Sequence, residues 1–277
     1  MNFLTSIWRV LNLLSLDVVF GAMAGMLFFA DLLDVSLPFV LYVVLGMAVW
    51  GIYTLDHLID AKRIVHLASS DRHRFHQKHF VSLCIILAIV VLSGFGLMIC
   101  FESLHFIFFP GVIFAGGMVL WMGFLQFFEK KLAWLKEIST AVFYAIGISL
   151  APFFSVFPNE VPVEFFLILI AYILLAGINL FMLSYIDEKS DAQDKLGSAL
   201  LLMSKIVLRR FILLLSMGAI IYLVGVFILV PSYYRIHVSV LLLLVLFHVF
   251  EFNRENGQNI RERLEASFLL PLVLLVL

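Results

Sequence analysis

Residues 35–55 read VSLPFVLYVVLGMAVWGIYTL, a run that contains no Asp, Glu, Lys or Arg. The hydrocarbon core of a bilayer is about 30 Å thick, and a helix needs about 20 apolar residues to cross it. Backbone polar groups in lipid must find partners within their own segment, which a helix provides. The run therefore predicts a transmembrane helix.

The same pattern repeats along the chain, where charge-free runs fall at 80–101, 103–128, 138–159, 165–186 and 211–234. Residues 10–32 also predict a span, with Asp17 as an interior acid. Shorter runs at 236–250 and 266–277 bring the count to about nine helices, the last being shorter than a full span. We expect an all-α, multi-pass transmembrane helical bundle in one domain, 1–277.

The composition excludes an ordinary soluble domain. Hydrophobic residues make up 64% of the chain, charged residues only 13%, and the mean hydropathy is +1.12. Soluble domains carry about a quarter charged residues. The formal net charge of −1 gives no reason to expect a nucleic-acid partner.

The positive charges predict the orientation in the membrane. Seventeen of the 18 Lys and Arg fall at the N-terminus or in every second connection between the predicted helices, and Arg235 is the exception. Cytoplasmic loops carry the excess of Lys and Arg. We therefore expect a cytoplasmic N-terminus and place the functional loops on the cytoplasmic side.

Two pairs of carboxylates follow predicted helices. YTLDHLIDAKR at 53–63 contains Asp56 and Asp60, and SYIDEKSDAQDK at 184–195 contains Asp187 and Asp191. Residues four apart share one helix face, where like charges repel, and burial near a membrane adds to the penalty. A bound cation explains the arrangement. The alternative is that these are solvated acids at helix ends.

Oxygen ligands of this kind suit Mg²⁺, which commonly binds through one or two carboxylates together with substrate phosphates. Basic residues near the acids would hold the remaining phosphate oxygens. The candidates that we select are Arg63, Lys130, Lys131 and Lys136.

The two motifs are separated by four predicted helices, so the helices that carry them point the same way. This spacing predicts two pseudo-repeats of about four helices, with one motif in 1–127 and the other in 128–277. Inverted-repeat transporters bind their substrates near the midplane instead. Acids at one end favour a chamber that opens to the inside over a transport path.

With these motifs, the whole chain resembles the UbiA superfamily of intramembrane prenyltransferases. That family has nine helices and Asp-rich motifs after helices 2 and 6. Tyr185-Ile186-Asp187-Glu188-Lys189-Ser190-Asp191 is similar to its second motif, and KKLAWLKEIS at 130–139 is similar to its basic segment before helix 5. The closest likeness is to a divergent, poorly characterised branch with a Tyr-Thr-Leu-Asp first motif.

The resemblance implies transfer of a prenyl group from an isoprenyl diphosphate to a lipophilic, aromatic acceptor. It implies Mg²⁺ held by Asp56, Asp60, Asp187 and Asp191, with the basic residues binding the diphosphate. It also implies an integral protein of the bacterial inner (cytoplasmic) membrane, with the active side cytoplasmic and membrane lipid as its surroundings.

Four further residues are candidate substrate contacts: Tyr53, Tyr185, Asp17 and Asn179. Aromatic faces stabilise allylic cations, and an ionisable residue inside a span is a functional hypothesis by default. The alternatives are interfacial aromatic residues for the two tyrosines, a structural hydrogen bond for Asp17 and helix packing for Asn179.

The first motif departs from the family pattern Asn-Asp-x-x-Asp-x-x-x-Asp, because Ile52 and Tyr53 occupy its first two positions. Ile52 cannot ligate a metal. This difference favours the alternative function, a non-catalytic UbiA-like protein for lipid binding or assembly.

Overall fold

The computed structural model describes residues 10–276 except 128, 158–160, 195, 197–199, 201–202 and 255–259, and the side chains of 126–134 also lie outside the description. Within these limits the chain forms helices and no strand. Its α-helices are α2 (Leu16–Leu32), α3 (Phe39–Arg63), α4 (Asp71–Lys78), α5 (Phe80–Cys100), α6 (His105–Phe127), α7 (Glu129–Val156), α8 (Val163–Ile186), α9 (Glu188–Asp194), α10 (Lys205–Leu229), α11 (Ser232–Asn253) and α12 (Ile260–Ser267). Two 3₁₀ helices are η1 (Glu102–Leu104) and η3 (Leu270–Leu275).

Seven helices in the described part of the chain are long and apolar enough to cross a membrane. They are Phe39–Arg63, Phe80–Cys100, Glu102–Leu125, Leu135–Val156, Val163–Ile186, Lys205–Leu229 and Ser232–Asn253. The prediction of an all-α, multi-pass integral membrane protein is confirmed at this level.

The two remaining runs of the predicted nine form shorter helices. Residues 10–32 are interrupted at Ser15, which has a φ of 55°, so that α2 begins only at Leu16 and is 17 residues long. Residues 266–277 contain the end of α12 and then η3, which includes Pro271. Proline lacks the N–H that an α-helix needs and clashes with the preceding turn. This run is therefore not a continuous α-helix.

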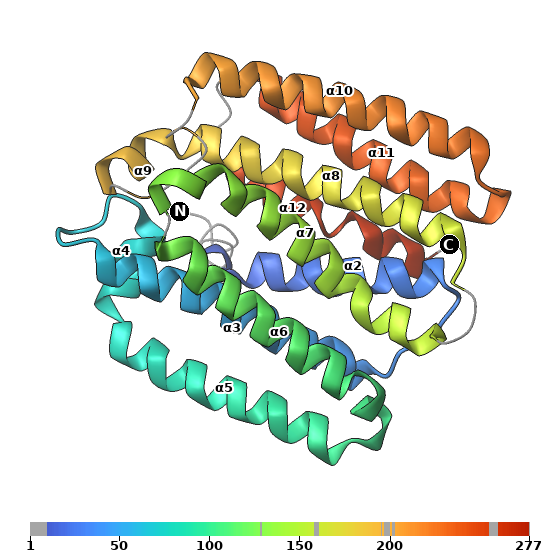
Figure 1. The fold of residues 1–277 in the computed structure, drawn as a ribbon, viewed down its shortest axis with the longest axis horizontal. Helices are drawn as coiled ribbons and strands as arrows, with labels where there is room; N and C mark the ends of the chain where they lie inside the picture. The colour runs from blue at the N-terminus through green and yellow to red at the C-terminus, as the bar shows by residue number, and fades with distance from the viewer. Residues whose placement is uncertain are drawn as a thin grey trace.

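Helix α8 is at the centre of the bundle and packs against α7, α10 and α11 (Figure 1). In α8, 56% of the most hydrophobic window is buried within the protein, against 6% in α5 and in α6. Helices α5 and α6 therefore leave most of their side chains for contact with lipid. Helices α3 and α8 run in the same direction and end at the side where α4 and α9 lie (Figure 1).

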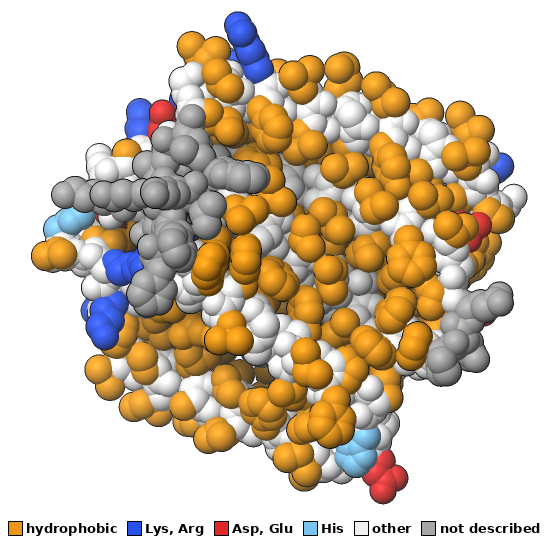
Figure 2. Space-filling model, viewed as in Figure 1, with side chains coloured by type: hydrophobic (Ala, Val, Ile, Leu, Met, Phe, Trp, Pro, Cys, Tyr) orange, Lys and Arg blue, Asp and Glu red, His pale blue; other side chains and the backbone are white. Residues whose placement is uncertain are grey.

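The surface agrees with this arrangement. Figure 2 shows hydrophobic side chains over most of one face, while Lys and Arg side chains gather toward the end where α4 and α9 lie. Exposed hydrophobic residues on the peripheral helices include Leu92, Phe109, Leu120, Leu214 and Leu229, which are 62–79% exposed. Lipid tails are the surroundings that such side chains match.

Helix α2 approaches α7 and α8 closely at Gly25, where two fully buried side chains lie against its backbone. A Cβ atom at this position would lie 2.6 Å from Cδ1 of Ile148 and 2.8 Å from the Tyr172 hydroxyl. Ile148 is 1% exposed and Tyr172 is 0% exposed, so neither has free space into which to move. The absence of a side chain at Gly25 is required by this packing.

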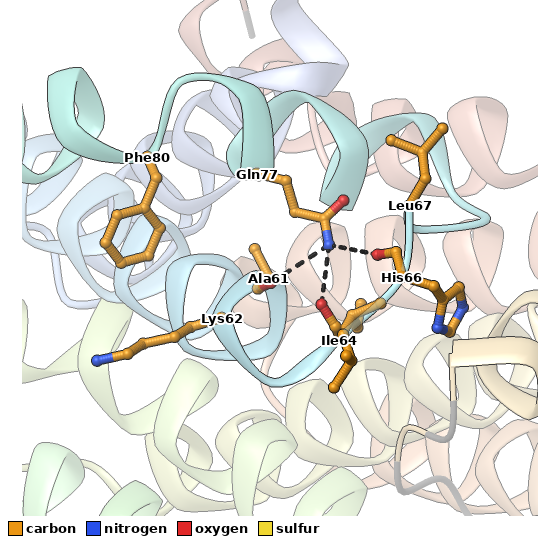
Figure 3. Close-up of a pocket in the computed structure, with 8 residues that line it drawn as sticks. Ala61, Lys62, Ile64, His66, Leu67, Gln77 and Phe80 are labelled. Carbon is orange, nitrogen blue, oxygen red and sulfur yellow. Dashed lines mark hydrogen bonds between the residues drawn. The ribbon is translucent and has the colours of Figure 1, made fainter.

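The amide side chain of Gln77 bonds to several backbone groups of the connection after α3 (Figure 3). Nε2 of Gln77 donates to the carbonyl oxygens of Ala61, Ile64 and His66 at 3.4, 3.2 and 2.9 Å, and its Oε1 accepts from the Ala68 amide at 3.0 Å. The last carbonyls of a helix lack partners within the helix. Gln77 therefore caps α3 and fixes the turn into α4, beside an open groove of about 440 Å³.

Gly25→Ala is expected to lower the free energy of unfolding by about 1–3 kcal/mol, because the added methyl overpacks a core without space for it. Thermal unfolding of the detergent-purified protein measures this. Gly96→Ala is the control, since a Cβ there has no atom within 4 Å, and alanine favours helix more than glycine does. Equal melting temperatures for the two variants would contradict the packing described at Gly25.

Candidate functional site

Both carboxylate pairs line one cavity of about 290 Å³, to which α2, α3, α4, α6, α7, α8, α9 and α12 contribute side chains. The acidic residues that line it are Asp56, Asp60, Glu137, Asp187, Asp191 and Glu265. The basic residues that line it are Arg63, Arg72, Lys136 and Arg261. Among the described side chains that line the cavity, the carboxylates outnumber the Lys and Arg side chains.

The first pair lies on the last turns of α3. Because α3 continues to Arg63, Asp56 and Asp60 share a helix face, as predicted. Nζ of Lys136, in the first part of α7, is 3.6 Å from Oδ2 of Asp56 and 3.9 Å from Oδ2 of Asp60. One lysine therefore bridges two carboxylates, and its charge offsets part of their repulsion.

The second pair lies where α8 turns into α9. Asp187 caps α8, and its carbonyl oxygen accepts from the Asp191 amide at 2.9 Å, which keeps the two residues one helical turn apart. Nη1 of Arg261 donates to Oδ2 of Asp187. Burial raises the pKa of Asp191 to about 7 and the negative charge of Asp187 adds to the rise, although Arg261 and Lys136 oppose it. The positive charges of Arg261 and Lys136 thus offset only part of the rise in the pKa of Asp191.

Three of the other predicted residues also line the cavity: Arg63, Tyr53 and Asn179. The Oδ1 atom of Asn179 is buried and has no hydrogen-bond partner in the described part of the protein. It is therefore available to a polar group of a ligand. The side chains of Lys130 and Lys131 lie outside the described residues.

Tyr185 and Asp17 are not among the residues that line the cavity. The ring of Tyr185 packs against Phe252 and lies under the Lys205 ammonium group. Successive residues on a helix are about 100° apart, so Tyr185 points away from the face shared by Leu183 and Asp187. The structure separates this tyrosine from the predicted site.

Asp17 is buried behind the cavity wall, where Nδ2 of Asn12 donates to its Oδ2 at 2.7 Å. The same amide donates to Oε2 of Glu265 at 2.7 Å. Of the two roles considered for Asp17, the structural hydrogen bond is the one present.

Two arginines that we did not select from the sequence belong to the site. Nη2 of Arg72, in α4, donates to Oδ1 of Asn12 at 3.0 Å and to Glu265 at 3.4 Å. Nε of Arg261, in α12, donates to Oε1 of Glu265 at 3.1 Å. Burial acts to raise the pKa of Glu265, but the positive charges of Arg261 and Arg72 outweigh this effect and lower the pKa to about 2. Only the i, i+4 spacing of Arg261 and Glu265 is a local signal for this network.

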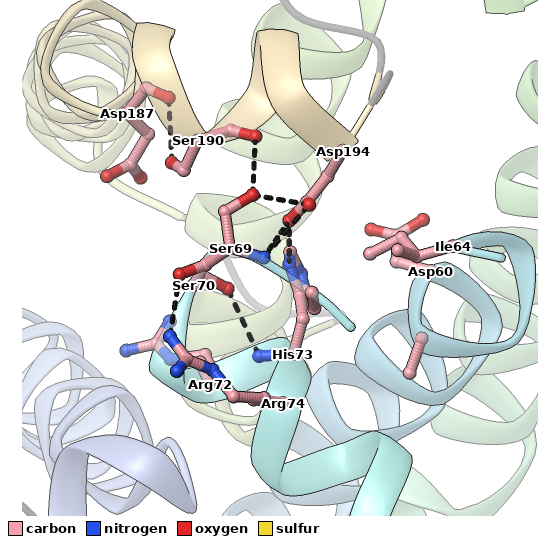
Figure 4. Close-up of polar contacts among 12 residues, drawn as sticks. Asp60, Ile64, Ser69, Ser70, Arg72, His73, Arg74, Asp187, Ser190 and Asp194 are labelled. Atoms are coloured by element: carbon pink, nitrogen blue, oxygen red, sulfur yellow. Dashed lines mark hydrogen bonds and ion pairs between the residues drawn. The ribbon is translucent and has the colours of Figure 1, made fainter. Parts of the chain in front are cut away.

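A second polar cluster joins the segment after α3 to α9 (Figure 4). The amide of Ser69 donates to both carboxylate oxygens of Asp194 at 2.9 and 3.1 Å, and its hydroxyl also contacts Asp194. Nε2 of His66 is 3.2 Å from the same carboxylate, whose side chain is fully buried. The segments that follow the two motifs are thus bonded directly to each other. We refer to Ser69, His66 and Asp194 as the clasp.

The two carboxylate pairs are the residues of this cavity that could contribute ligands to Mg²⁺. Carboxylate oxygens are the preferred ligands of Mg²⁺, which usually takes only one or two of them plus phosphate oxygens. Among the described residues no group of three or more His, Cys, Asp or Glu could by itself hold a metal ion. The remaining ligands would have to come from phosphate and water.

Comparison of the chain with protein-family models, with curated proteins and with solved structures finds no match.

We expect Asp194→Asn to open the clasp, because the charged acceptor of two Ser69 donors becomes a neutral amide. Such bonds are worth about 1.5–3 kcal/mol. Hydrogen exchange of residues 64–70 at neutral pH should rise, and the control Asp34→Asn, at an exposed acid in the connection between α2 and α3, should leave it unchanged. Unchanged exchange in Asp194→Asn would show that the clasp does not hold this segment.

The difference in hydrogen exchange between Asp194→Asn and the wild-type protein should also depend on pH. Burial acts to raise the pKa of Asp194, but hydrogen bonds from Ser69 and the neighbouring His73 bring it below its ordinary value. A carboxylate with a depressed pKa stabilises the fold above its ordinary pKa and loses this effect as the pH falls. The substitution should therefore matter progressively less below about pH 4.

Proposed function

We propose that the protein is an intramembrane prenyltransferase of the UbiA type, which transfers a prenyl group from an isoprenyl diphosphate to a lipophilic, aromatic acceptor and depends on Mg²⁺. One observation carries the proposal. Asp56, Asp60, Asp187 and Asp191 come from two motifs that are far apart in the sequence, and they line the same cavity.

The character of the cavity supports a substrate with one charged and one apolar end. Besides its charged residues, it is lined by Met118, Trp121, Met122, Phe143, Tyr144 and Phe268. Phe143 and Tyr144 follow Lys136 by two turns of α7, or roughly 11 Å along the helix. A diphosphate near Lys136 would leave the prenyl chain among these apolar and aromatic side chains.

The reaction breaks the bond between the first prenyl carbon and the diphosphate oxygen, and the electron pair leaves with the diphosphate. A new bond forms between that carbon and the acceptor, which loses a proton. Bound Mg²⁺ would neutralise the leaving group. Asp56, Asp60, Asp187 and Asp191 would hold the ion, while Lys136 and Arg63 would bind the developing negative charge. The surrounding helices would exclude water from the allylic cation.

A second candidate is a non-catalytic UbiA-like protein that binds lipid or assists assembly. Lys136 already bridges Asp56 and Asp60, and Arg261 already contacts Asp187. These contacts would let the fold persist without metal, and Ile52 removes a possible ligand from the first motif.

Binding of geranylgeranyl diphosphate to the detergent-purified protein, with and without Mg²⁺, separates the two candidates. The transferase is expected to bind in the presence of Mg²⁺, and Asp56→Ala/Asp187→Ala should weaken binding at least about tenfold, since charged contacts are lost. Asp71→Asn, outside the cavity, should bind like wild type. No binding of this donor, or of shorter and longer ones, would favour the non-catalytic protein.

The proposal also places the site on the cytoplasmic side. In a Cys84→Ala/Cys100→Ala background, Glu102→Cys should react with a membrane-impermeant maleimide in intact cells. Lys189→Cys, beside the second motif, should react only after permeabilisation. Both side chains are exposed in the structure. Labelling of Lys189→Cys in intact cells would place the site on the opposite side.

A further inference from the structure

The guanidinium group of Arg261 connects the cavity to the buried network behind it. Its Nη1 contacts Asp187 on the cavity side, and its Nε donates to Glu265 on the network side at 3.1 Å. About a third of the side chain, 32%, is exposed, and Arg261 lines the cavity. Arg261 thus lies inside the protein but faces the space that a ligand would occupy.

The orientation of this guanidinium is fixed from behind. Glu265 is one helical turn further along α12 and is 5% exposed. It is held in turn by Nδ2 of Asn12 at 2.7 Å and by Arg72 at 3.4 Å. Since Nε is bonded to this fixed carboxylate, the plane of the Arg261 guanidinium is set before any ligand arrives.

The two terminal nitrogens of Arg261, Nη1 and Nη2, can each donate a hydrogen bond to a ligand in the cavity. Nη1 has only Asp187 as its acceptor, and Nη2 has no acceptor in the described part of the protein. Two terminal guanidinium nitrogens side by side match two oxygens of one phosphate group. Asp187 would also serve Mg²⁺, whose positive charge repels a guanidinium at the same carboxylate. An incoming anion would offset that repulsion.

We propose that Arg261 binds a phosphate group of the donor diphosphate, with Glu265 as the residue that positions it. The inference rests on the proposed function and extends the diphosphate site to α12, which lies outside both carboxylate motifs. Arg261 exchanges part of its contact with Asp187 for phosphate oxygens when the donor binds.

The experiment titrates the full-length, detergent-purified protein with inorganic diphosphate in the presence of Mg²⁺ and measures heat. This probe has no prenyl chain, so partition into the micelle does not contribute. Arg261→Gln is expected to raise Kd roughly 10- to 100-fold through loss of charged hydrogen bonds. Arg263→Gln is the matched control, because Arg263 lies on the same helix but bonds to Glu251 at 2.8 Å, away from the cavity.

Arg261→Lys keeps the charge that Asp187 and Glu265 require but lacks the planar pair of donors. It should fold and bind with an intermediate Kd. Melting temperatures of all variants identify loss of binding that comes from unfolding, and Arg261→Lys decides the question if Arg261→Gln does not fold.

The outcomes separate the two proposals. A wild-type Kd in folded Arg261→Gln, or in Arg261→Lys where Arg261→Gln does not fold, would overturn the role of Arg261 and leave the diphosphate site intact. Absence of diphosphate binding in the wild-type protein, with and without Mg²⁺, would overturn both. Equal weakening by Arg263→Gln would show a general effect of positive charge and also overturn the specific role of Arg261.

Discussion

Charge neutralisation at the end of an apolar bundle is the constraint on which this structure depends. A carboxylate or guanidinium removed from water without a partner is strongly destabilising. The described lining of the cavity nevertheless gathers six carboxylates and four Lys and Arg side chains in a protein with only 13% charged residues. Their mutual pairing determines which segments must meet at this end.

Each pairing joins segments that are remote in the sequence. Lys136 brings the start of α7 to the end of α3, and Arg261 brings α12 to the end of α8. Arg72 brings α4 to both the N-terminal segment and α12. The clasp then ties the connection after α3 to α9. The polar end therefore adds contacts between specific segments to the apolar packing within the bundle.

The helices could be located from the sequence because a bilayer sets their minimum length, and the seven that could cross a membrane match charge-free runs. The four aspartates could be grouped because each pair repeats at one helical turn. The roles of Arg72, Arg261 and Glu265 could not be predicted, since apart from the i, i+4 pair of Arg261 and Glu265 their contacts span 60 to 253 residues.

Two further differences have local causes. Tyr185 is close in sequence to Asp187 but does not line the cavity, because two residues along a helix correspond to about 200° of rotation. The predicted helix at 266–277 contains Pro271, and that segment is a 3₁₀ helix in the structure. Hydrophobicity marks which residues leave water, but the direction of a side chain and the continuity of a helix depend on backbone geometry.

Helix α6 has a consequence for how the cavity keeps its shape. It contributes Met118, Trp121, Met122 and Leu125 to the lining, yet only 6% of its apolar window is buried within the protein. One wall of the cavity thus comes from a helix whose other faces pack against little else in the protein. In a bilayer, acyl chains would cover those faces, and the surrounding lipid would form the outer side of that wall.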